Sequence, residues 1–228
     1  MLYAALGDSI TYGYSAEDEN ARYVNRIQSS LSRKQPVNLF LHAKPGWTSK
    51  QLLKESRKVP DVIWAEARLI TIMVGGNDVL RHAPWLLDGG TTRIFKVADK
   101  LRDNLEELID LVRGPKCTIV LGTLYNPFPK SVMVERYLDV INQSIRSVAQ
   151  REKLPLADIA KHFVRREGQF IDGYKRGKMT DMRIIGNPIH PNDKGHEAIA
   201  QIFLRAYQRS TGGTRSSNVR VAKLRSGR

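Results

Sequence analysis

The chain contains little cysteine and no long apolar run, and each absence excludes a class of protein. Cys117 is the single cysteine among 228 residues, which excludes an internal disulfide and a cysteine-based metal cluster. No run of 18 apolar residues is present, so the sequence predicts no membrane-spanning helix. Residues 1–6 lack a basic start, and their apolar run is too short for a signal peptide. By default we therefore expect a cytoplasmic protein.

Acidic residues are scarce relative to basic ones, and the excess of positive charge is uneven. The net charge is +14, and residues 209–228 carry +6 of it with no acidic residue. That segment is also rich in Ser, Gly and Thr, so we expect a flexible basic tail after a domain at 1–208. The tail either binds an anionic surface, such as phospholipid or a cell-wall polymer, or has no partner. It has no aromatic residue to stack on bases, and the sequence predicts no specific nucleic-acid partner.

Short apolar runs alternate with segments of helical periodicity along the chain. This alternation predicts an α/β fold with a parallel sheet of about five strands and helices on both faces. In such sheets the reactive groups lie at the carboxyl ends of the strands. The expected strands are 2–6, 37–41, 68–74, 117–121 and a weak one within 154–159, and the expected helices are 21–34, 49–58, 91–112, 131–153 and 191–209.

Three segments at expected strand or helix ends carry groups suited to acyl transfer. The first, GDSITYG at residues 7–13, presents Ser9 in a tight turn after a strand. The second, VGGND at 74–78, places Asn77 where its amide could stabilise a negative charge. The third, at 187–196, holds His190 between two prolines as a candidate base for Ser9. Each segment alone is equally typical of a turn or a helix cap, but their combination and order favour a catalytic site.

Taken together, these segments resemble the SGNH hydrolases, also called the GDSL lipase/esterase family, over about residues 1–207. The resemblance implies a three-layer flavodoxin-like fold, ester hydrolysis with no cofactor, and a bacterial source. It assigns Ser9 as nucleophile and His190 as base. It also assigns the oxyanion hole to the N–H groups of Ser9 and Gly46 and the side chain of Asn77. A bacterial enzyme of this kind could also be deposited on a cell surface or a spore.

The sequence departs from the family pattern at Asn187, where the family usually has the aspartate of a D-x-x-H block. That acid normally orients the histidine and stabilises the imidazolium. Three alternatives follow. A backbone carbonyl or the Asn187 oxygen orients His190, or Asp181 or Asp172 substitutes for the acid, or the site is catalytically weak. Asp193 is expected instead to cap the last helix.

The substrate is indicated by the loops expected at the carboxyl edge. Residues 82–90 and 122–134 are rich in apolar side chains, which favours a pocket for an acyl chain. We therefore expect lipid or phospholipid esters, with acetylated sugars or thioesters as the enzymatic alternative. A binding or structural protein with weak catalysis, anchored by its tail, is the alternative from another class. No spacing typical of metal ligands occurs, so no metal is predicted.

Overall fold

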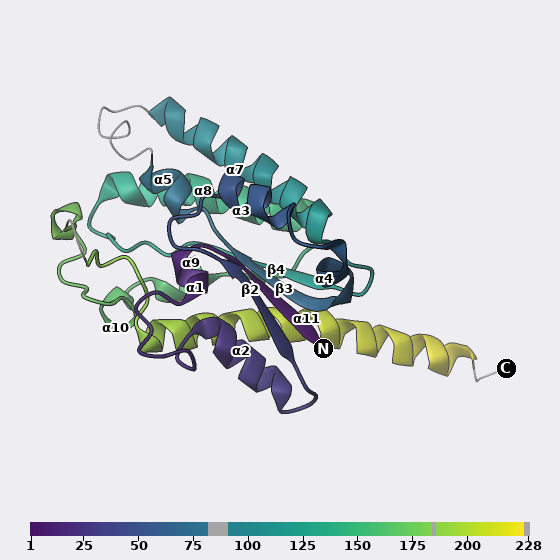
Figure 1. The fold of residues 1–228 in the computed structure, drawn as a ribbon. Helices are drawn as coiled ribbons and strands as arrows, with labels where there is room; N and C mark the ends of the chain where they lie inside the picture. Colours follow the sequence, from purple (N-terminus) through teal and green to yellow (C-terminus); the bar gives the residue numbers. More distant parts are fainter. Residues whose placement is uncertain (82–90, 184–185, 226–228) are drawn as a thin grey trace.

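The protein folds around one parallel sheet, and the computed structural model describes the backbone of residues 1–81, 91–183 and 186–225. Side chains are described in the same ranges except at 91–92 and 212–225. The strand order is β2-β1-β3-β4-β5, and every pairing is parallel (Figure 1). The predicted five-stranded α/β fold is confirmed. The strands are β1 (Leu2–Gly7), β2 (Asn38–Ala43), β3 (Ala67–Met73), β4 (Thr118–Gly122) and β5 (Leu156–Ala157).

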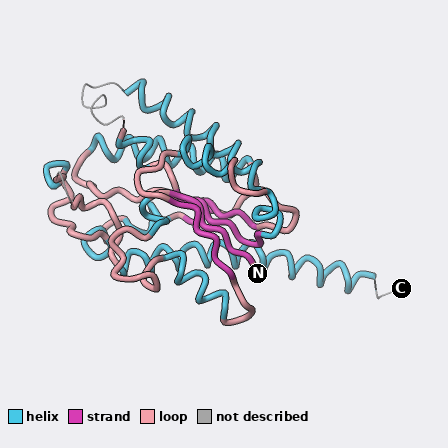
Figure 2. The backbone as a smooth tube through the Cα atoms, in the orientation of Figure 1, coloured by secondary structure: helices cyan, strands magenta, loops and turns pink. Residues whose placement is uncertain are grey.

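Helices cover both faces of the sheet and produce three layers (Figure 2). Helices α2 and α11 pack on one face, and α3, α7 and α8 pack on the other. The longer helices are α2 (Tyr23–Ser32), α3 (Ser49–Ser56), α7 (Thr91–Val112), α8 (Val132–Arg151) and α11 (Asp193–Arg225). The shorter ones are α1 (Ser9–Tyr12), α4 (Asp61–Glu66), α5 (Gly76–Leu80), α9 (Ile159–Phe163), α10 (Glu167–Phe170) and the 3₁₀ turn η1 (Met179–Asp181).

The central strand β3 is buried on both faces, as its apolar sequence predicts for a parallel sheet. Ile70 and Ile72 are at most 1% exposed. The hydroxyl groups of Thr71 and Tyr3 lie 3.0 Å apart within this core and form a hydrogen bond, so neither polar group is left unsatisfied. A rigid centre of this kind gives the loops at the carboxyl edge a fixed base.

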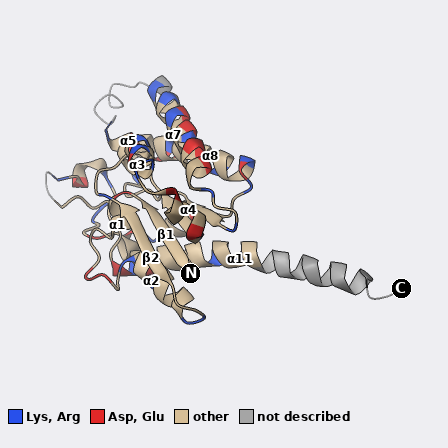
Figure 3. Cartoon of the chain, turned by 45° about the vertical axis from the view of Figure 1, so that its right-hand side comes forward, with Lys and Arg blue, Asp and Glu red and all other residues tan. Residues whose placement is uncertain are grey.

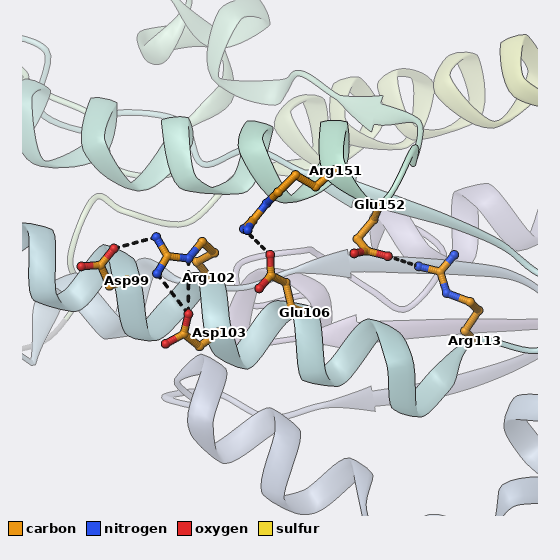
Figure 4. Close-up of polar contacts among 7 residues, drawn as sticks. All are labelled: Asp99, Arg102, Asp103, Glu106, Arg113, Arg151 and Glu152. Atoms are coloured by element: carbon orange, nitrogen blue, oxygen red, sulfur yellow. Dashed lines mark hydrogen bonds and ion pairs between the residues drawn. The ribbon is translucent and has the colours of Figure 1, made fainter.

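Charged residues of both signs follow the outer face of α7 (Figure 3). Figure 4 shows the ion pairs of this region, in which Arg102 contacts two aspartates on its own helix. Glu106 of α7 pairs with Arg151 of α8, and Arg113 pairs with Glu152, the residues that directly follow the two helices. Exposed pairs of this kind each contribute about 0–1 kcal/mol. The packing of α7 on α8 therefore depends mainly on the buried apolar side chains of the two helices.

The predicted helices are found, but the shorter elements and some ends differ from expectation. Helices α1, α4, α5, α9 and α10 and the 3₁₀ turn η1 were not predicted, because three to six residues are too few to show a helical period. The cap of α11 is Asn192, whose side chain accepts from Gly195 N–H at 3.0 Å. The expectation for Asp193 is therefore wrong, since its carboxylate accepts from Glu17 N–H instead. The backbone of α11 continues beyond the predicted end at residue 209.

Candidate active site

Ser9 stands at the junction between β1 and α1, at the carboxyl edge of the sheet. Asp8 caps α1, and its side chain accepts a hydrogen bond from Ile10 N–H at 3.0 Å. The preceding residue must be glycine, since a Cβ on Gly7 would lie 2.1 Å from Thr11 Oγ1 and 2.4 Å from the Met73 carbonyl oxygen. The tight turn therefore fixes Ser9 directly above the central strands.

His190 lies beside Ser9, although 181 residues separate them in the chain. The distance between His190 Nε2 and Ser9 Oγ is 3.0 Å. Burial lowers the pKa of His190 to about 4, and the negative charge of Asp172 opposes this shift. The imidazole is therefore neutral at pH 7. With its proton on Nδ1, it can accept the Ser9 hydroxyl proton at Nε2.

Three groups surround the place where an oxyanion would form. Neither Ser9 N–H nor Gly46 N–H donates a hydrogen bond within the described part of the chain. Gly46 has a φ of +84°, a conformation that favours glycine. Asn77 Nδ2 donates to the Trp47 carbonyl at 3.0 Å, which fixes the amide and leaves its second N–H for another acceptor. Ser9, Gly46 and Asn77 all line the same cavity.

Buried hydrogen bonds connect the segments that carry Gly46 and Asn77. The Asp78 carboxylate accepts from Ser49 N–H at 2.9 Å and from the Ser49 hydroxyl at 2.6 Å. Thr48 caps α3 in a capping box with Gln51. The loop that carries Gly46 is thereby tied to α5, which carries Asn77.

The structure does not place Asn187 or Asp181 against His190. The Asn187 side-chain oxygen accepts from Arg183 N–H at 2.6 Å, and within the described residues no hydrogen bond joins Asn187 to His190. Asp181 binds the backbone N–H groups of Arg176 and Lys178 and the Arg176 guanidinium. Burial raises the pKa of Asp181, but these contacts outweigh it and hold the pKa below its ordinary value. Both side chains bind groups of their own loops rather than the His190 ring.

Asp172 is the predicted substitute acid that does lie near His190. Its backbone N–H donates to the His190 carbonyl at 2.9 Å, and its charge raises the pKa of the imidazole. The side chain is exposed, and no hydrogen bond joins it to the ring among the described residues. Asp172 therefore acts on His190 through its charge and its backbone rather than as an orienting carboxylate.

The contacts that three residues make around His190 were missed at the sequence level. Tyr14 packs against His190 in a tilted arrangement, with ring centroids 4.3 Å apart. The Tyr125 hydroxyl donates to the Ile189 carbonyl at 2.6 Å, and so fixes the backbone next to His190. His196 is fully buried, and its Nε2 contacts the Tyr14 carbonyl oxygen at 3.2 Å. Tyr14 lies close to GDSITYG, but no local pattern reveals these long-range contacts.

A cavity of about 770 Å³ opens beside Ser9 and His190. Most of its walls are apolar and come from the loop after β4, the start of α8 and the segment around η1. The cavity is lined by five residues of the expected loop 122–134, namely Leu124, Tyr125, Pro127, Phe128 and Met133, together with Val134, Tyr137, Leu138, Met179 and Met182. Val132, from the same loop, does not line the cavity and is 63% exposed. The other predicted loop, 82–90, lies outside the described residues.

The described residues contain no group of three or more His, Cys, Asp or Glu side chains that could hold a metal ion. In the same residues, no helix has both the length and the apolar character needed to span a bilayer.

A serine in contact with a neutral histidine at the carboxyl edge of a three-layer α/β sheet is the arrangement of a serine hydrolase. The model of the GDSL-like Lipase/Acylhydrolase family matches residues 5–198. The chain belongs to this family, and it is a carboxylic ester hydrolase.

Known proteins agree with this assignment. The spore germination lipase LipC of Bacillus licheniformis is 24% identical over 212 residues, which is 88% of this chain and 93% of the relative. Two solved structures share the fold. The lipase Lip_vut3 from a goat rumen metagenome has a TM-score of 0.75 at 22% identity, covering 90% of this chain and 97% of its own. The acetylxylan esterase Axe2 of Geobacillus stearothermophilus has a TM-score of 0.66 at 18% identity, covering 90% and 93%.

Proposed function

We propose that the protein hydrolyses esters of apolar acyl chains, such as lipid or phospholipid esters, through an acyl-enzyme on Ser9. The observation that carries this proposal is the contact of Ser9 with His190 beside a large cavity with mostly apolar walls. An acyl chain can bury its methylene groups there, at about 0.8 kcal/mol each. One relative is named a spore germination lipase, which is consistent with a lipid substrate.

The reaction starts when Ser9 Oγ forms a bond to the ester carbonyl carbon and His190 Nε2 takes the hydroxyl proton. The resulting oxyanion accepts hydrogen bonds from Ser9 N–H, Gly46 N–H and Asn77 Nδ2. When the intermediate collapses, the bond to the alcohol oxygen breaks and His190 protonates the leaving alcohol. A water molecule then attacks the acyl-enzyme while His190 takes its proton, and this step releases the acid and restores Ser9.

Initial rates on p-nitrophenyl esters from acetyl to palmitoyl test the proposal. We expect the highest kcat/KM on medium or long chains, and loss of hydrolysis in Ser9→Ala. A maximum of kcat/KM at the acetyl ester would favour the alternative of a carbohydrate acetylesterase. The acetylxylan esterase Axe2 shares the fold, which is consistent with that alternative. No hydrolysis by the intact chain at any length would favour a binding role.

We further propose that an anionic lipid surface is the partner of the cavity mouth. Three cavity-lining side chains, Tyr14, Leu80 and Met182, are between 37% and 50% exposed. Exposed cations adjoin the lining residues in sequence, namely Lys44, Arg81, Lys178 and Arg183. Apolar side chains next to cations suit a membrane whose headgroups are negative.

Vesicle sedimentation in the Ser9→Ala background separates surface binding from catalysis. We expect binding to phosphatidylglycerol vesicles that weakens as salt rises, and little binding to phosphatidylcholine vesicles. A second variant, with the six tail cations replaced by Gln, shows whether the cavity mouth or the tail binds the vesicles. If the cavity mouth is the binding surface, this variant should still bind phosphatidylglycerol vesicles. Equal binding to both lipids, or binding that salt leaves unchanged, would contradict the electrostatic proposal.

A further inference from the structure

The Tyr14 ring lies against the His190 imidazole in a tilted arrangement. Their centroids are 4.3 Å apart with an interplanar angle of 35°. Tyr14 also lines the cavity and is 50% exposed. The ring therefore lies next to the imidazole that becomes positively charged when it accepts the proton of Ser9.

The backbone of Tyr14 is fixed on both sides, so the position of its ring is not accidental. Its N–H donates to the Ser9 carbonyl at 2.9 Å. Its carbonyl accepts from His196 Nε2 at 3.2 Å. The neighbouring residues Gly13 and Ser15 both have positive φ, 94° and 64°, which marks a sharply bent segment.

His196 is a suitable anchor because its tautomer is defined. Its Nδ1 accepts from Tyr23 N–H at 3.4 Å, so the proton lies on Nε2 and is donated to Tyr14. Burial lowers the pKa of His196 to about 4, which keeps this arrangement neutral near pH 7. Tyr14 is thereby tied to α1 through Ser9 and to α11 through His196.

His190, in contrast, has no carboxylate hydrogen-bonded to its ring within the described residues. Its backbone is held by Tyr125 through the Ile189 carbonyl and by Asp172 N–H. These contacts fix the position of the loop. The charge of Asp172 favours the imidazolium, but its side chain is exposed and solvent screens it. A further group against the ring can therefore add to that stabilisation.

We propose that Tyr14 is a positioning residue that orients His190 and stabilises its imidazolium form through the face of its aromatic ring, in place of the missing carboxylate. A cation over a tyrosine face is attracted by the ring quadrupole. This inference rests on the proposed role of His190 as base. The other charged or titratable groups around the histidine pair are Asp172 at His190, and Asp193 and Arg26 at His196. These remain unchanged in the variants below.

The test compares Tyr14→Leu and Tyr14→Phe with a matched control, Tyr12→Leu. Tyr12 is an exposed tyrosine at the end of α1 that pairs with Arg22 rather than with His190. For Tyr14→Leu we expect kcat to fall about fivefold with little change in KM, as loss of a half-exposed cation–π contact implies. Tyr14→Phe keeps the ring face and should lose much less kcat than Tyr14→Leu, while Tyr12→Leu should stay near wild type.

The pH profile separates this role from a merely structural one. Loss of the attraction lowers the pKa of His190. The acid limb of the kcat/KM profile of Tyr14→Leu should therefore shift to lower pH by about 0.7 unit, which corresponds to a fivefold change in the acid dissociation constant of the imidazolium. If the ring only shields His190 from water, its removal will move the limb up instead. An upward or absent shift, or equal losses in Tyr14→Phe and Tyr14→Leu, would overturn the inference.

The same assays distinguish failure of the inference from failure of the proposed function. If His190→Ala and Ser9→Ala lose activity while Tyr14→Leu retains both its kcat and its acid limb, only the role of Tyr14 is wrong. If His190→Ala retains activity, the proposed mechanism itself is wrong, and the inference falls with it.

Discussion

Asp8 is a buried carboxyl group beside the nucleophile, and its replacement by Asn should change how stability depends on pH. The side chain is 3% exposed. Burial raises the pKa of Asp8 from 3.8 to about 7, the hydrogen bond from Ile10 N–H opposes the shift, and the charge of Asp78 adds to it. Because the folded-state pKa is the higher one, the stabilising contribution is fully present below pH 3.8 and is lost as the pH rises through 7.

The size of this effect follows from the shift of about three pKa units. At 1.36 kcal/mol per unit, ionised Asp8 costs about 4 kcal/mol of folding free energy at pH 8. Asp8→Asn keeps an oxygen acceptor for Ile10 N–H and removes the charge. The unfolding free energy of the variant minus that of the wild type should therefore grow by about 4 kcal/mol between pH 4 and pH 8.

Urea unfolding at unit steps from pH 4 to pH 8 measures this difference. His190 and His196 have lowered pKa values, so they contribute stability that is lost as pH falls from about 6.5 to about 4. This term is common to both proteins and cancels in the difference. Asp139→Asn, at an exposed position of α8, controls for the exchange itself. Parallel stability curves for Asp8→Asn and the wild type would refute the reasoning.

Three further outcomes test the site. Asn77→Ala should lower kcat by about 100-fold with a small change in KM, because it removes one oxyanion donor. A large rise in KM with little change in kcat would instead indicate a role in substrate binding. Val134→Trp should narrow the apolar cavity, so that hydrolysis of palmitoyl esters falls much more than that of acetyl esters in the chain-length assay. The kcat/KM of the wild type should hold from pH 8 down to about 5 and fall below it, since the pKa of His190 is lowered to about 4 by burial; an acid limb near pH 6.5 would contradict that burial.

The sequence predicts the elements whose signal is local and long. Strand β3 is apolar on both faces, α7 and α8 show several helical periods, and the turn at Gly7 and the proline-flanked His190 mark strand and helix ends. In a parallel sheet all these ends meet at one edge. The contact between Ser9 and His190 could therefore be expected, although 181 residues separate them.

The rest depends on contacts that no local pattern contains. The neighbours of His190 include Tyr14, Tyr125 and Asp172, which reach it from three separate parts of the chain. Asp181 has the right chemistry for a substitute acid, but its loop turns the carboxylate onto Arg176. Short helices such as α4 and α9 form because the body of the protein supports them, and tertiary packing of this kind leaves no periodic signal.

The most direct test of the central claim is the intact mass of the protein after rapid mixing with p-nitrophenyl octanoate and quenching in acid. We expect a transient species heavier by one octanoyl group, with the modification located at Ser9 by peptide mapping and absent from Ser9→Ala. Hydrolysis by the wild type at a normal rate with an adduct on another residue, or undiminished hydrolysis by Ser9→Ala, would contradict an acyl-enzyme on Ser9.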